Sequence, residues 1–181
     1  MKKLIIVCIV LLGLTACVET KRGETEKDGL ATVENTMSEV GSVGDGTSMH
    51  SLEFVRTDGD TLYVFYENNA VGGLACGDIV SVEYFEHEGE LTAKYIVNLT
   101  ALCNEWKGVG DADSYSFTLK EDGSVASTGF DTAYNRWAII NGQLTISESN
   151  ADKAEKYDIV LLTEDSLVLK SDDETEMRMA K

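Results

Sequence analysis

Residues 137–146 read Trp-Ala-Ile-Ile-Asn-Gly-Gln-Leu-Thr-Ile. An Asn-Gly pair between two runs rich in apolar and β-branched residues is a strong signal for a β-hairpin with a two-residue turn. Similar turn pairs follow other short alternating runs, namely Asp58-Gly59, Glu88-Gly89 and Asp122-Gly123. No helix-period stretch follows the N-terminal segment, so the pattern predicts an all-β protein.

Residues 49–103 are expected to form a first, small β unit. Both faces of the run around Leu62, Tyr63 and Val64 are apolar, which is typical of a strand in a small closed barrel or a sandwich. Together with Gly77–Val82 and Ala93–Val97, this run resembles small OB-like barrels of envelope lipoproteins. The strands expected in this unit are His50–Arg56, Thr61–Glu67, Asp78–Glu86 and Leu91–Thr100.

Residues 104–181 are expected to form a second β unit, whose short strands and tight turns predict an antiparallel up-and-down meander or barrel. Its expected strands are Tyr115–Lys120, Ser124–Ser127, Tyr134–Asn141, Gln143–Ser149, Tyr157–Thr163, Leu167–Lys170 and Glu176–Ala180. Strand alternation predicts a set of inward-pointing residues. These are Tyr115, Phe117, Leu119, Trp137, Ile139, Leu144, Ile146, Ile159, Leu161, Leu167 and Leu169.

The second unit resembles the lipocalin-like domains of Bacteroidota lipoproteins. The resemblance rests on the order of several short segments: Trp106–Gly108, Phe117–Val125, Tyr134–Trp137, Asn141–Ile146 and Leu162–Leu169. It implies an antiparallel barrel or half-barrel, and members of this group usually have no assigned activity.

Four aromatic residues of the second unit are candidate ligand-facing residues: Tyr115, Phe117, Tyr134 and Trp137. An eight-strand barrel is just wide enough either to be filled by its own side chains or to hold one small ligand. The sequence leaves both readings open, because large apolar side chains at these positions also serve as ordinary core.

The N-terminus has the parts of a secretory signal. Met1-Lys2-Lys3 precedes the apolar run Leu4–Leu14, which is too short for the ~20 residues that a membrane-spanning helix needs. Leu14-Thr15-Ala16-Cys17 resembles the lipobox of bacterial lipoproteins. This resemblance implies removal of residues 1–16 and acylation of Cys17. Residues 17–48 are polar, so we expect them to form a flexible tether behind the acylated cysteine.

The formal charge of −17 argues against nucleic acid as a partner, because such a surface repels phosphate backbones. No nucleophile-elbow, zinc-protease or P-loop motif occurs, and His50 and His87 lack the spacing of metal ligands. We therefore expect no catalytic residue, no metal site and no cofactor, and we expect a protein that is not an enzyme.

Cys76 and Cys103 remain after removal of the signal, and the envelope is an oxidising compartment. If Glu88-Gly89 centres the hairpin of its two flanking strands, Cys76 opposes Ala101 and Cys103 is a diagonal neighbour at ~7 Å. That spacing is at the limit for a disulfide, which a twist or a bulge would bring within reach. A disulfide and two buried free thiols are both open.

The sequence as a whole predicts a lipid-anchored protein of the cell envelope, located in the outer membrane with its face undecided. The leading hypothesis for its function is binding of a small apolar ligand or a partner protein by the lipocalin-like unit. The alternative is a structural module that docks on an outer-membrane protein assembly.

The lipid anchor is tested by changing the acylated residue. Cys17→Ser removes the sulfur that would carry the diacylglycerol, so the intact mass of the variant should include residues 1–16 and no diacylglycerol. The wild type should enter the detergent phase in Triton X-114 partitioning and show an intact mass that includes a diacylglycerol on Cys17. A wild-type mass without this adduct would contradict the lipobox assignment.

Overall fold

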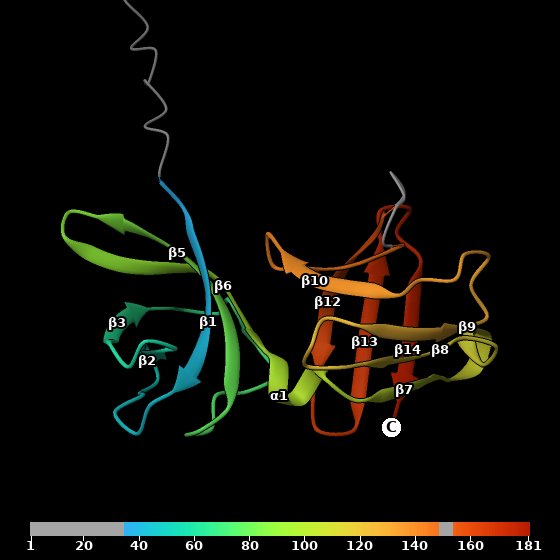
Figure 1. Cartoon of the computed structure of the whole chain (residues 1–181), viewed down its shortest axis with the longest axis horizontal. Coiled ribbons are helices and arrows are strands. Elements are labelled where there is room, and N and C mark those ends of the chain that lie inside the picture. Colours follow the sequence, from blue (N-terminus) through green and yellow to red (C-terminus); the bar gives the residue numbers. More distant parts are fainter. Residues whose placement is uncertain (1–34, 149–153) are drawn as a thin grey trace, which may run out of the picture. The chain divides into compact units, whose positions relative to one another are not determined.

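The structure, a computed structural model, describes residues 35–148 and 154–181. The expected signal peptide, Cys17 and residues 17–34 of the expected tether lie outside these residues. Across the described residues the fold is all-β, with one short α-helix and two β-sheets; Figure 1 shows the arrangement of these elements. Within the described ranges, no helix has the length and apolar character needed to cross a membrane.

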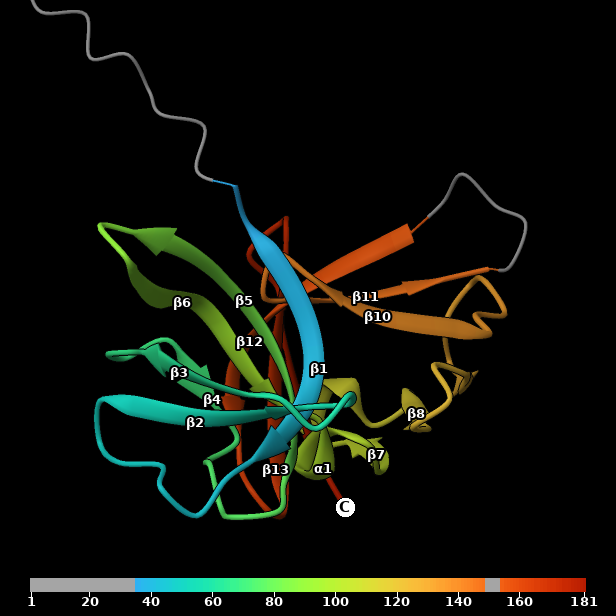
Figure 2. The ribbon, with the colours of Figure 1, turned by 60° about the vertical axis from the view of Figure 1, so that its left-hand side comes forward.

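The first sheet forms a closed N-terminal barrel. Strands β1, β2 and β3 are antiparallel neighbours, and β1 also pairs with β5, which pairs with β6. A parallel pair between β3 and β6 closes the circle of five strands, as Figure 2 shows at the left. The OB-like barrel expected from the sequence is therefore a barrel and not a sandwich. Its strands are β1 Met37–Val43, β2 Ser51–Arg56, β3 Thr61–Phe65, β4 Ala70–Val71, β5 Ile79–His87 and β6 Glu90–Asn98.

Strand β1 corrects the predicted extent of the tether, which was placed at residues 17–48. Met37–Val43 lies between β2 and β5 and completes the barrel. The segment looks polar because Gly41 takes the place of an apolar side chain. A Cβ atom at Gly41 would lie 2.7 Å from the ring of Phe54 and 2.4 Å from the carbonyl oxygen of Val55. The core thus fills this position from the neighbouring strand, which composition does not reveal.

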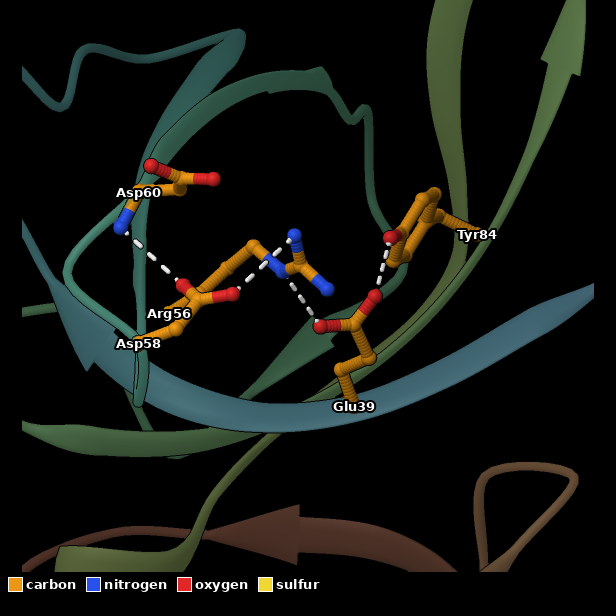
Figure 3. Close-up of polar contacts among 5 residues, drawn as sticks. All are labelled: Glu39, Arg56, Asp58, Asp60 and Tyr84. Carbon is orange, nitrogen blue, oxygen red and sulfur yellow. Dashed lines mark hydrogen bonds and ion pairs between the residues drawn. The ribbon is translucent and has the colours of Figure 1, made fainter.

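A polar network ties β1 to both of its neighbours. Tyr84 Oη on β5 donates a hydrogen bond to Glu39 Oε1 at 2.6 Å, and Arg56 Nε on β2 donates to Glu39 Oε2 at 2.7 Å. Asp58 Oδ2 lies 3.5 Å from Arg56 Nη1 (Figure 3). The hydrogen bond from Tyr84, followed by that from Arg56, lowers the pKa of Glu39. Burial, with the bond to Glu39, raises the pKa of Tyr84 to about 12.

The second sheet forms the C-terminal barrel, which follows helix α1 (Leu99–Leu102). Eight antiparallel strands lie in up-and-down order, and the last strand, β14, pairs with the first, β7. Between β9 and β10 the ladder is reduced to one bridge, Ser124 with Arg136, so the barrel is nearly closed. The strands are β7 Glu105–Gly108, β8 Ser116–Leu119, β9 Val125–Thr128, β10 Arg136–Ile140, β11 Gln143–Ser147, β12 Ala154–Leu162, β13 Ser166–Ser171 and β14 Glu176–Ala180.

Side chains fill the interior of the C-terminal barrel. Trp106 is completely buried, and its indole Nε1 donates a hydrogen bond to Leu102 O at 2.9 Å. Its ring is therefore anchored at the end of α1, where the polar N–H has the partner that a buried indole needs. The remaining interior is apolar and includes Phe117, Leu119, Leu144, Ile146, Leu167 and Leu169.

One predicted inward residue is wrong. Leu161 is 44% exposed, whereas its neighbour Leu162 is 6% exposed. The register between β12 and β13 shifts after Ile159, so one extra residue interrupts the alternation. The bulge thus moves Leu162 into the position that strict alternation assigned to Leu161.

The predicted proximity of Cys76 and Cys103 required the hairpin of β5 and β6 to continue as far as these two residues. In the structure the hairpin ends before it reaches them. The pairing of β5 with β6 shifts by one residue after Glu83 and stops at Val80 and Asn98. Beyond that point the chain enters α1, where the side chain of Asn98 accepts from Ala101 N. Both thiols are free, with Cys76 exposed and Cys103 half-buried. Burial raises the pKa of Cys103 to about 11.

The Glu39 network predicts a pH-dependent contribution to stability. Glu39→Gln should lower the free energy of unfolding by about 1–2 kcal/mol at pH 7, since each hydrogen bond to a charged group contributes about that much. The native state lowers the pKa of Glu39, so its contribution is present above pH 4.5, the ordinary value, and is lost as the pH falls through the folded-state pKa. In urea unfolding, the difference in free energy of unfolding between the wild type and Glu39→Gln should therefore shrink from pH 7 to pH 3. Glu86→Gln, on the exposed end of β5, is the control. A constant difference across this range would contradict the prediction.

Candidate functional site

A recess of about 490 Å³ lies at one end of the C-terminal barrel. Because the strands run up and down, the loops β7–β8 and β9–β10, the start of β12 and the β13–β14 turn all meet at this end. The volume falls within the usual range for small-molecule sites. The lining residues are Tyr115, Gly129, Phe130, Asp131, Ala154, Glu155, Lys156, Tyr157, Ser171, Asp172, Asp173, Thr175 and Met177.

Aromatic rings form a continuous row along one side of the recess. The ring centroids of Tyr115 and Phe130 are 5.0 Å apart, and those of Phe130 and Tyr134 are 5.7 Å apart. Both pairs have the edge-to-face arrangement that ring quadrupoles favour. Tyr115 and Phe130 are half-buried, so part of each ring remains available to a ligand.

A carboxylate with two tyrosine partners lies beside this row. Tyr134 Oη donates a hydrogen bond to one oxygen of Glu155, and Tyr157 Oη donates to the other. Both tyrosines are buried, each with 6% of its surface exposed. Burial, with the contact to Glu155, raises the pKa of Tyr134 to about 12 and raises the pKa of Tyr157 further. Both phenols thus stay protonated at neutral pH and hold the carboxylate in place.

Two glycines allow the β7–β8 loop to fold back and present Tyr115. Gly129 has φ +88°, and a Cβ there would lie 2.1 Å from Ser114 O. A Cβ at Gly108 would lie 1.7 Å from Ala112 O. No side chain fits at either glycine, so the close approach of the backbones at these two positions sets the place of Tyr115.

The four predicted ligand-facing residues are not in one place. Tyr115 lines the recess, and Tyr134 lies directly behind Phe130. Phe117 is part of the filled core. Trp137 donates from its indole Nε1 to Lys120 O at 2.9 Å, next to the β8–β9 turn at the opposite end of the up-and-down barrel.

Phe130, Glu155 and Tyr157 complete the recess, and sequence reasoning did not select them. Phe130 lies in the β9–β10 loop, outside any alternating run, so no local pattern marks it. Glu155 and Tyr157 share one face of β12 by alternation, but the predicted strand began only at Tyr157. A predicted strand that began before Glu155 would have placed Glu155 and Tyr157 on the same face.

The side chains that the structure describes around the recess do not group as metal ligands. Among residues 35–148 and 154–181, no group of three His, Cys, Asp or Glu side chains could hold a metal ion. His50 and His87 are exposed residues of the N-terminal barrel. The chemistry of the site is therefore that of aromatic rings, hydroxyl groups and carboxylates.

The role of Gly129 is testable. Gly129→Ala should destabilise the protein by about 2–4 kcal/mol, because a methyl group meets Ser114 O and a non-glycine residue at positive φ adds strain. Gly110→Ala is the matched control, since Gly110 also has a positive φ (+68°) but nothing within 4 Å of its Cβ position. Gly110→Ala should lower the free energy of unfolding only by the backbone strain, about 1–2 kcal/mol. Equal losses in urea unfolding would show that the close approach does not matter.

The C-terminal barrel coincides with a stretch of sequence that matches a known protein family. Residues 99–181 match the family model described as lipocalin-like. No curated protein and no solved structure matches the chain. The matched range contains α1 and all eight strands of the second sheet, so it is the C-terminal barrel that is similar to the lipocalin-like family.

Proposed function

We propose that this protein is a lipid-anchored protein of the bacterial cell envelope whose lipocalin-like domain binds one small ligand with an apolar part. The observation that carries the binding role is the recess of about 490 Å³ with Tyr115, Phe130 and Tyr157 in its lining. Aromatic rings around a concave site, of which Tyr115 and Phe130 are half-buried, offer an apolar ligand a surface on which it loses contact with water.

The position of the recess determines how such a ligand would bind. Trp106, Phe117 and their neighbours occupy the barrel interior, so a ligand would enter only the end and not the centre. The hydrogen bonds of Tyr134 and Tyr157 to Glu155 hold the wall of the recess in one arrangement before binding. A preformed wall reduces the entropy lost on binding.

The envelope location rests on Cys17 and the segment before it. Two acyl chains on one cysteine hold a protein stably on a membrane, whereas one chain gives only marginal binding. The folded part then needs no membrane contact of its own. The polar segment that follows Cys17 would separate the lipocalin-like domain from the lipid surface.

A docking module on an outer-membrane protein assembly is the second candidate function. Its support is on the N-terminal barrel, where Tyr63 and Phe65 on β3 are 58% and 45% exposed and Met49 is 80% exposed. Large apolar side chains on a surface are typical of protein contacts when they lie together. This candidate requires no ligand in the C-terminal recess.

Binding at the recess is tested with the neutral apolar fluorophore N-phenyl-1-naphthylamine. The wild type should show one saturable site, and Phe130→Ala should weaken binding at least fivefold because it removes the central ring of the aromatic row. Phe85→Ala, on β5 of the N-terminal barrel, is the control and should leave the affinity unchanged.

Circular dichroism and thermal unfolding must show that the Phe130 variant is folded. No binding by the folded wild type, or equal binding by the wild type and the folded variant, would remove the support for this site. The docking role would then be the better account.

A further inference from the structure

The lining of the recess is strongly negative. Asp131, Glu155, Asp172 and Asp173 contribute four carboxylates, against one basic residue, Lys156. Lys156 lies on the opposite face of β12 from Glu155 and Tyr157, because successive residues of a strand alternate between faces.

Two of these carboxylates are held by partners of the protein itself. Glu155 accepts from Tyr134 and Tyr157. Asp173 accepts from Ser171 Oγ at 2.5 Å and from Thr175 N at 3.2 Å, and these bonds lower its pKa. All of these partners are neutral hydroxyl or amide groups, so within residues 35–148 and 154–181 the hydrogen bonds to these two carboxylates bring no positive charge to the recess.

Aromatic rings next to these carboxylates favour one class of ligand. The face of a tyrosine or phenylalanine ring attracts a cation through its quadrupole, and the attraction is strongest where the cation has lost water. A carboxylate adds a Coulomb attraction that a recess screens less than open solvent does. The same charges repel an anion such as a fatty-acid carboxylate or a sulfate.

We propose that the ligand of this recess is an organic cation, an amine or quaternary ammonium group attached to an apolar part. The apolar part packs on Tyr115, Phe130 and Met177, and the cationic group lies near Glu155 and the acidic rim. This inference rests on the proposed function, since it names the ligand class of the same site.

Three probes that share a benzyl group separate charge from apolar contact: benzyltrimethylammonium, benzyl alcohol and phenylacetate. Each probe is titrated into the isotope-labelled chain without residues 1–16 at pH 7. The shifts of the NMR resonances of the recess give the three affinities. Benzyltrimethylammonium should bind at least fivefold more tightly than benzyl alcohol, and phenylacetate should bind most weakly. Added salt should reduce the preference for the cation.

A pair of double variants shows whether the recess or the overall charge is responsible. Asp131→Asn with Asp172→Asn removes two charges at the recess, whereas Glu121→Gln with Glu164→Gln removes two from turns at the opposite end of the barrel. Only the first pair should abolish the preference for benzyltrimethylammonium. Equal effects of both pairs would assign the preference to the net charge and overturn the inference.

The outcomes distinguish the two proposals. Equal binding of all three probes at the recess would leave a site for apolar ligands and would overturn only the cation specificity. No change in the resonances of the recess with any of the probes, together with no binding of N-phenyl-1-naphthylamine, would overturn both.

Discussion

The width of an eight-strand barrel is the constraint that shapes the C-terminal domain. Such a barrel has room for one layer of side chains or one small ligand, and here the side chains of Trp106, Phe117, Leu144 and Leu167 take that room. The interior therefore stabilises the fold and leaves the end of the barrel for function. The aromatic row and Glu155 lie at that end, on loops and strand termini that the filled core holds in place.

In the N-terminal barrel, the first strand, β1, has few apolar residues and is still part of the closed sheet. Burial of Val43 contributes at one end of β1, and Gly41 lets Phe54 occupy the space that a side chain would need. Backbone pairing with β2 and β5 and the packing of Met37 add to this, and Glu39 contributes polar contacts to Tyr84 and Arg56. Arg56 compensates the charge of this carboxylate, whereas the hydrogen bonds that Glu155 accepts from described residues come from two neutral phenols.

Local patterns were sufficient for most strands but not for the site. The Asn141-Gly142 hairpin has the predicted register, with Ile140 opposite Gln143, because turn chemistry acts over a few residues. Strict alternation failed at Leu161, where a bulge shifts the register, and the extrapolated hairpin failed at Cys76 and Cys103, where α1 replaces the strand. In both places a local irregularity, a bulge within the β12–β13 hairpin or a helical turn capped by Asn98, interrupts the regular strand pattern.

The amino-acid pattern is enough to predict the all-β fold and the up-and-down order of the C-terminal strands, because turns and strand alternation are local properties. It also marks Cys17, which lies outside the described residues. The recess is different. Tyr115, Phe130, Glu155 and Tyr157 come from three separate segments, and they meet only because closure of the barrel brings those segments to the same end. Their proximity is a consequence of long-range strand pairing, which no short stretch of the chain contains.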